Sequence, residues 1–182
     1  MGRNKMLLPL DGESILRRAV GRAVAAGLDP VVVVLGHDAE RARDELAGVS
    51  CRAVVNPDYA RGVNVSLRAG IAALPAEARA VVVILADMPF VTASMMETLV
   101  ERYRETTAPL VVSEYDGVNA PPILYDRSLF SELGAMEGEG CGKQVVKKHR
   151  SEAAVVAWPA EALADVDVPD DYERARAGLA SG

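Results

Sequence analysis

Carboxylates follow two segments of this sequence where metal chemistry could occur. Asp87 comes directly after the apolar run of residues 80–86, and Asp165 and Asp167 alternate in an acidic segment ahead of Pro169. Mg²⁺ prefers oxygen ligands and usually takes one or two carboxylates together with substrate phosphates. Asp87 could equally stabilise the following turn, and Asp167 could be the N-cap of a helix that begins at Pro169. Whether Asp87 and Asp167 approach each other depends on the fold.

Groups that could hold a phosphate or a polar ligand lie in two other segments. Lys5 precedes the first apolar stretch and is either a phosphate contact or a solvated terminal charge. Residues 56–70 leave a strand, turn and open a helix, whose first N–H groups can hold an anion. Gly62 would let a ligand approach the backbone closely. The alternative is an ordinary strand–helix loop in which Ser66 is a solvated polar residue.

Short apolar runs alternate with helical periods along the chain, which is typical of a mostly parallel sheet covered by helices. We expect strands over residues 31–35, 52–55, 80–85, 109–113, 122–125 and 153–158, and helices over residues 13–26, 39–46, 64–74, 93–105 and 141–149, with a final helix from Pro169. Residues 1–182 form one domain in this interpretation. The fold class is α/β, a doubly wound Rossmann-like sheet, in which ligands bind at the carboxyl ends of the strands.

Composition excludes several classes of protein. The 182 residues carry a net charge of −6 with 4% aromatic residues, so the chain is a poor nucleic-acid binder. No apolar run approaches the roughly 20 residues that span a bilayer, and no secretory signal follows Met1, so we expect a cytoplasmic protein with no membrane partner. Two cysteines and two histidines are too few for a disulfide scaffold or a zinc centre.

Five motifs together resemble one family. They are NPDYARGVNVSLRAG at residues 56–70, LADMPFV at 85–91, PILYDRSLFSEL at 122–133, GEGCGK at 138–143 and DVDVPDDYERA at 165–175. In this order they resemble the molybdenum cofactor cytidylyltransferase branch of the molybdopterin nucleotidyltransferase family, over nearly the whole chain.

The resemblance implies transfer of CMP from CTP to the terminal phosphate of molybdopterin, with release of pyrophosphate. By motif position, Asp87 and Asp167 would bind Mg²⁺, with Asp165 a further candidate, and Lys5 would contact the phosphates. The segment with Ser66, Gly62 and Arg68 would face the nucleoside, and Lys143 would contact the pterin side. A molybdenum hydroxylase apoenzyme, or its maturation factor, would be a protein partner.

The family's first strand and glycine loop, L-A-A-G-x-S-x-R, would precede Met1. We therefore expect the sheet of residues 1–182 to lack one central strand and its catalysis to be impaired. Three alternatives stay open: a guanylyltransferase, another small-molecule nucleotidyltransferase, and a non-catalytic carrier of the pterin cofactor. A nicotinamide-dependent dehydrogenase is disfavoured because no G-x-G-x-x-G motif follows a first strand.

Overall fold

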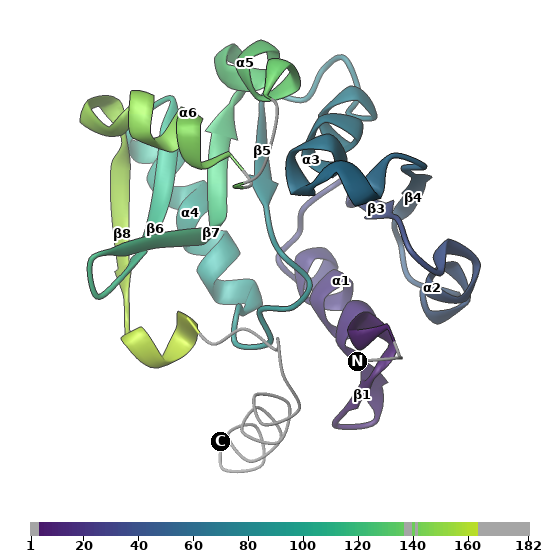
Figure 1. The fold of residues 1–182 in the computed structure, drawn as a ribbon. Helices are drawn as coiled ribbons and strands as arrows, with labels where there is room; N and C mark the ends of the chain where they lie inside the picture. Colours follow the sequence, from purple (N-terminus) through teal and green to yellow (C-terminus); the bar gives the residue numbers. More distant parts are fainter. Residues whose placement is uncertain (1–3, 137–139, 141, 164–182) are drawn as a thin grey trace.

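The computed structural model describes residues 4–136, 140 and 142–163. Within these ranges, no helix is long and apolar enough to cross a membrane. Figure 1 shows a larger sheet, a separate pair of parallel strands and a short hairpin near the N-terminus, with helices packed around them. Besides the α-helices and strands described below, short 3₁₀ turns occur at Lys5–Leu7, Tyr59–Arg61, Arg127–Leu129, Arg150–Glu152 and Ala160–Leu163.

A short hairpin follows the 3₁₀ turn at Lys5–Leu7, and its second strand occupies residues where the sequence predicts the start of a helix. Strands β1 (Pro9–Leu10) and β2 (Glu13–Ser14) pair antiparallel around Asp11 and Gly12, which both have positive φ. An Asp-Gly pair suits such a two-residue turn because both residues tolerate that conformation. The expected helix over residues 13–26 therefore begins later, as α1 (Ile15–Ala25), where the Ser14 hydroxyl accepts a hydrogen bond from the Arg17 amide.

The first strand group follows the prediction closely. Strands β3 (Val32–Leu35) and β4 (Arg52–Val55) pair in parallel, with α2 (Ala39–Glu45) between them in the sequence. Val33 and Leu35 pack with α1 and α2 in one buried cluster. These three assignments, β3, β4 and α2, differ from the predicted boundaries by no more than one residue at either end.

The predicted α/β fold class is confirmed. The second group is a four-stranded sheet in the order β5-β7-β6-β8, in which β6 and β8 are parallel and β7 is antiparallel to both of its neighbours. Its strands are β5 (Ala80–Val83), β6 (Leu110–Tyr115), β7 (Val118–Asp126) and β8 (Ala154–Trp158). The prediction placed only residues 122–125 in the third of these. The strand instead begins at Val118, after a turn at Asp116 and Gly117 with positive φ at both residues, so it runs antiparallel to β6 and to β5.

Helices cover both faces of this sheet. On one face, α4 (Ala93–Thr106) packs through Leu99 on Val111 and Leu124. On the other face, α5 (Phe130–Ala135) and α6 (Lys143–Lys148) pack on Leu110, Val112, Ile123 and Tyr125, together with part of α3 (Val63–Ala72). Alternate residues of β6 thus face opposite helical layers, as the two-residue period of a strand requires.

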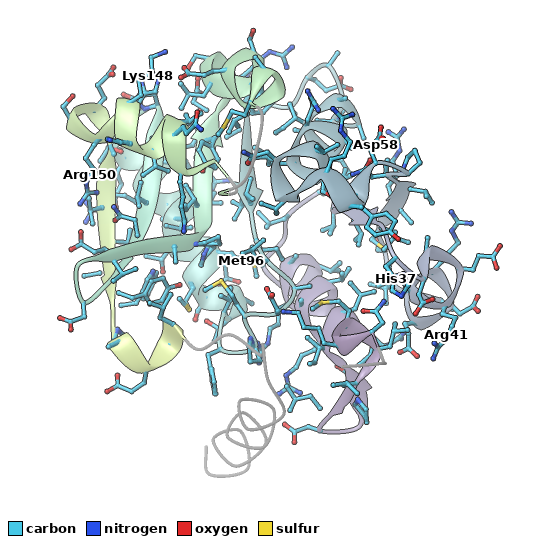
Figure 2. The ribbon with its side chains drawn as sticks, in the orientation of Figure 1. His37, Arg41, Asp58, Met96, Lys148 and Arg150 are labelled. Carbon is cyan, nitrogen blue, oxygen red and sulfur yellow. The ribbon has the colours of Figure 1, made fainter. Side chains whose placement is uncertain are left out.

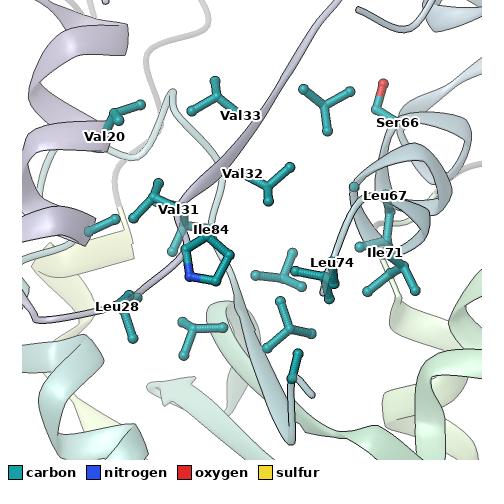
Figure 3. A pocket seen from close by; sticks show the side chains of 18 of the residues that line it. Val20, Leu28, Val31, Val32, Val33, Ser66, Leu67, Ile71, Leu74 and Ile84 are labelled. Carbon is teal, nitrogen blue, oxygen red and sulfur yellow. The ribbon is translucent and has the colours of Figure 1, made fainter. Parts of the chain in front are cut away.

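The two strand groups share no backbone ladder among the described residues. Between β3 and β5 lies a cavity of about 760 Å³, walled by the two strands and closed by α1 and α3 (Figure 3). We call this cavity the slot. Among the described residues, no strand pairs with either β3 or β5 on the side that faces the slot. Because its walls are mainly valine, leucine, isoleucine and alanine, it is a gap in the core rather than a polar ligand site.

An ionic cluster joins α5 to the end of α6. His149, the C-cap of α6, has its Nε2 atom 2.9 Å from Glu132 Oε2 on α5 and its Nδ1 atom 3.1 Å from Glu152 Oε1. Lys148, labelled in Figure 2, lies 3.0 Å from the other Glu132 oxygen. The hydrogen bond to Glu132, followed in size by the one to Glu152, raises the pKa of His149. The hydrogen bond with His149 is also the largest cause that lowers the pKa of Glu132.

This cluster predicts a pH-dependent contribution of His149 to stability. Since the folded pKa of His149 lies above its unfolded value of about 6.5, the stabilisation is complete below that pH and is lost as pH rises through the folded pKa. The difference in Tm between wild type and His149→Gln should be larger at pH 6 than at pH 9. His37→Gln, at a side chain that is 67% exposed, is the control. A constant difference across this range would contradict the assignment.

Candidate functional site

The predicted residues Lys5 and Asp87 are in direct contact. Lys5 Nζ lies 2.8 Å from Asp87 Oδ2, although 82 positions separate the two residues in the sequence. The side chains are 29% and 23% exposed, so the pair lies at the surface of the core and can be reached from solvent. A lysine beside a carboxylate at a strand end can bind a phosphate and a cation next to each other.

Asn4 holds Lys5 at the carboxyl end of β3. The Asn4 side chain accepts a hydrogen bond from the Met6 amide at 3.2 Å and donates one to the His37 carbonyl at 3.2 Å. His37 follows β3 by two residues and lies beside α2 (Figure 2). Since Asp87 follows β5, residues 4 and 5 bridge the carboxyl ends of the two strands that border the slot.

Arg22 of α1 holds the loop that carries Asp87. Its Nη1 atom donates hydrogen bonds to the carbonyl oxygens of Pro89 and Val91, the latter at 2.8 Å. Burial, with the neighbouring Arg18 cation, lowers the pKa of the Arg22 guanidinium, but arginine stays charged in proteins. Charged donors on two carbonyls of one short loop fix the position of that loop relative to α1.

The predicted nucleoside segment is organised by Asn56, which is 5% exposed. Its Nδ2 donates to Ser66 Oγ at 3.1 Å, and its Oδ1 accepts from the Asp58 amide at 3.0 Å. Asp58 is labelled in Figure 2 close to α3. Gly62, with φ of 112°, is the N-cap of α3, and no side chain caps this helix start. A side chain at position 62 would be strained, and glycine itself offers no side-chain acceptor to the first N–H groups of α3.

Lys143 begins α6 close to the start of α3. The Gly142 amide donates to Oδ1 of Asn64 at 3.3 Å, and Asn64 is fully buried in the first turn of α3. Gly142 has φ of +84°, and a Cβ at this position would collide with the Tyr125 hydroxyl. Lys143 itself is exposed and borders a small hollow of about 440 Å³ with Asn119, Lys147 and Arg150.

The structure therefore brings some predicted residues together and leaves others unplaced. Lys5 contacts Asp87, and the segment of Ser66 and Gly62 meets the loop of Lys143 through Asn64 and Gly142. Arg68 lies half-buried on α3. Asp165 and Asp167 lie outside the described residues. Within the described ranges no group of three or more histidine, cysteine, aspartate or glutamate side chains lies close enough to hold a metal ion.

Sequence reasoning missed Arg22, Asn56 and Asn64 as site residues. The sequence analysis treats Asn56 only as the residue that follows a strand. Its position between an apolar run and Pro57 is the signal that its side chain could organise a loop. Asn64 had a weaker signal, a polar residue in the first turn of an apolar helix. Arg22 had none, because an arginine on a predicted amphipathic helix is ordinarily solvated.

A family model described as the MobA-like NTP transferase domain matches residues 1–154. The chain belongs to this family. The similarity extends to the purine catabolism protein PucB of Bacillus subtilis (strain 168), which is 29% identical over 98% of this chain and 91% of PucB.

Solved structures agree with this membership. Rv0371c of Mycobacterium tuberculosis H37Rv superposes with a TM-score of 0.86 at 26% identity, over 97% of this chain and 90% of Rv0371c. A second structure of Rv0371c is a complex with manganese, with a TM-score of 0.82. The molybdopterin-guanine dinucleotide biosynthesis protein A of Archaeoglobus fulgidus shares the fold, with a TM-score of 0.68 at 18% identity, over 100% of this chain and 93% of that protein.

The two Arg22 hydrogen bonds predict a stabilising role that can be measured without substrate. Arg22→Met leaves the carbonyls of Pro89 and Val91 without their charged donor and should lower the free energy of unfolding by about 2–3 kcal/mol in urea titrations. Arg41→Met is the matched control, because Arg41 is 69% exposed in a long ion pair and should change stability by less than about 0.5 kcal/mol. Equal losses in the two variants would contradict the role of Arg22.

Proposed function

We propose that this chain transfers CMP from CTP to the terminal phosphate of molybdopterin and releases pyrophosphate, with Mg²⁺ as cofactor. The observation that carries the proposal is the 2.8 Å contact of Lys5 with Asp87, at the carboxyl end of β5. Membership of the MobA-like NTP transferase family supports the reaction class. The five sequence motifs support the choice of CTP and of a molybdopterin acceptor.

The residues suit a transfer in which the protein supplies charge and position. When an acceptor phosphate attacks the α-phosphate of a nucleotide, negative charge collects on the equatorial oxygens and on the leaving pyrophosphate. The attacking phosphate is already ionised at neutral pH and needs no base. Lys5 would contact the phosphates and offset part of this charge, and the uncapped start of α3 offers backbone N–H donors.

Asp87 would hold the Mg²⁺ ion, with Asp167 and also Asp165 as proposed further ligands. A divalent ion bound to the phosphates would neutralise charge and make pyrophosphate a better leaving group. Partial exposure of Asp87 leaves room for a cation that is shared with a substrate. The manganese complex of Rv0371c supports a divalent ion in a related protein.

The acceptor would approach from the side of α6. Lys143 is exposed at the start of this helix, next to the hollow that Lys147 and Arg150 also border. Lys143 and Lys147, beside Arg150 that pairs with Glu114 at 2.8 Å, suit an anionic acceptor in a chain whose net charge is −6. Ser66, Gly62 and Arg68 would face the nucleoside. We place this activity in the cytoplasm, where a molybdenum hydroxylase or its maturation factor would receive the product.

A second candidate is a nucleotidyltransferase that uses another small acceptor or GTP. The similarity to PucB favours this candidate, because it extends over 98% of the chain. It shares the proposed roles of Lys5 and Asp87 and differs in the base and acceptor. Assays that compare nucleotides and acceptors therefore distinguish the two candidates. Variants that remove the Lys5–Asp87 pair do not.

Removal of the Asp87 charge tests the proposed metal role. Asp87→Asn should reduce Mg²⁺-dependent pyrophosphate release at least about 100-fold, because the cation loses its carboxylate, while Tm changes by only a few degrees. Asp44→Asn, on the exposed side of α2, is the control and should keep full activity. Full activity in Asp87→Asn would refute the metal role. Loss of the folded state would assign Asp87 to structure instead.

Competition between nucleotides tests the base preference. With molybdopterin as acceptor, kcat/KM for CTP should exceed that for GTP at least about 100-fold, because a pocket shaped for a pyrimidine excludes a purine and leaves its polar groups unpaired. Equal or faster turnover of GTP would assign the chain to guanylyl transfer. Turnover of CTP with acceptors other than molybdopterin would support the second candidate.

A further inference from the structure

The hollow beside α6 contains a polar atom that has no hydrogen-bond partner. The hollow is lined by Asn119, Ile123, Lys143, Val146, Lys147 and Arg150. Oδ1 of Asn119 is shielded from solvent, and no described residue donates a hydrogen bond to it. A buried amide oxygen without a donor is costly, because it loses its hydrogen bond to water and gains none from the protein. Because Asn119 lies in the wall of a hollow, a bound ligand can supply the missing donor.

Strand β7 places Asn119 at the edge of the sheet where Asp87 also lies. Ile123 of β7 pairs with Val83, the last residue of β5, and the two strands are antiparallel. The β7 residues that precede Ile123 therefore extend in the direction in which the chain leaves β5 toward Asp87. The hollow and the proposed reactive pair thus share one edge of the sheet, where an acceptor and a nucleotide could meet.

Two cations of the hollow are not neutralised by a described carboxylate. Arg150, labelled in Figure 2, donates to Glu114 at 2.8 Å. Lys143 and Lys147 are exposed on α6 and form no ion pair with a described residue. Residues four apart share one face of a helix, so the two ammonium groups can reach the same anion. A phosphate group, which accepts several hydrogen bonds from cations, suits this pair of lysines.

The remaining lining residues are apolar. Ile123 and Val146 are 3% and 5% exposed and belong to the cluster that packs α5 and α6 on the sheet. Glu114, the cross-strand neighbour of Asn119, is already engaged by Arg150. The hollow therefore combines a cationic side, an apolar surface that suits a flat ring, and one amide oxygen without a donor.

We propose that Asn119 selects the acceptor of the transfer, and that it favours a phosphorylated ring that carries an N–H or O–H group. This inference rests on the proposed function, whose acceptor side it specifies. Lys143 and Lys147 bind the phosphate, the ring lies on the apolar residues, and Oδ1 of Asn119 accepts the hydrogen bond of the ring donor. Because no donor holds Oδ1 in place, the carboxamide can turn about its Cβ–Cγ bond to meet the ligand. The selection applies to molybdopterin and to any other small acceptor of this chemical class.

The first test measures stability without any ligand. Asn119→Leu replaces the carboxamide by an apolar group of similar size, so the unpaired oxygen is removed and Tm should stay equal or rise. Gln144→Leu, at an exposed amide of α6 outside the hollow, is the matched control and should leave ligand binding unchanged. A fall in Tm of more than about 5 °C in Asn119→Leu would assign a structural role to Asn119 and overturn the proposal.

The second test compares two probes that both carry a phosphate. One is a pterin monophosphate, whose ring has N–H donors, and the other is phenyl phosphate, whose ring has none. Calorimetry should show that the unsubstituted chain binds the pterin probe at least about tenfold more tightly, and that Asn119→Leu reduces this preference at least about fivefold. Lys147→Gln should weaken both probes by a similar factor and keep the preference, because it removes a charge and leaves the amide in place.

An unchanged preference in Asn119→Leu would overturn the proposal. So would an unsubstituted chain that binds neither probe or binds the two equally. Because these measurements need neither CTP nor turnover, they are separate from the test of the transferase. A preference that depends on Asn119, found without CMP transfer, would confirm Asn119 as a specificity residue and refute the transferase proposal. CMP transfer with the same acceptor preference in wild type and Asn119→Leu would refute this inference alone.

Discussion

In the part of the chain that the structure describes, no backbone ladder joins β3 to β5, and this determines how the rest of that part is held together. The two strand groups are connected through helices: α1 contacts both α2 and α4, and α3 contacts both β3 and α5. At the carboxyl end of the slot, the contacts of Asn4 with His37 and of Lys5 with Asp87 complete the connection. The charged pair proposed for chemistry therefore also joins the two halves of the fold.

Side-chain amides organise the candidate site more than ionic groups do. Asn4 and Asn56 each accept a hydrogen bond from a backbone amide through Oδ1 and donate another through Nδ2, and Asn64 accepts one from Gly142. An amide can satisfy a donor and an acceptor at once, so it stabilises the irregular backbone where strands end. Each of these residues lies at a junction between a strand or loop and a helix.

The apolar cavity and the charged pair have separate physical origins. The slot follows from strands that have no common neighbour, and its walls are hydrocarbon with few polar groups. The candidate site follows from loops that leave the strands, where partial exposure permits contact with charged substrates.

Local sequence by itself determined much of the secondary structure. β4 coincides with its predicted range, and α4 extends one residue beyond it, with Thr92 as N-cap, because apolar runs and capping residues act over a few positions. The antiparallel direction of β7 was not predicted, because a short apolar run does not show in which direction a strand runs. That direction follows from the turn at Asp116 and Gly117, which reverses the chain between β6 and β7. The residue types at Lys5 and Asp87 suggested phosphate and metal chemistry. Only the tertiary structure decided that they meet and that Arg22 and Asn64 support the loops around them, because such contacts depend on how distant segments pack.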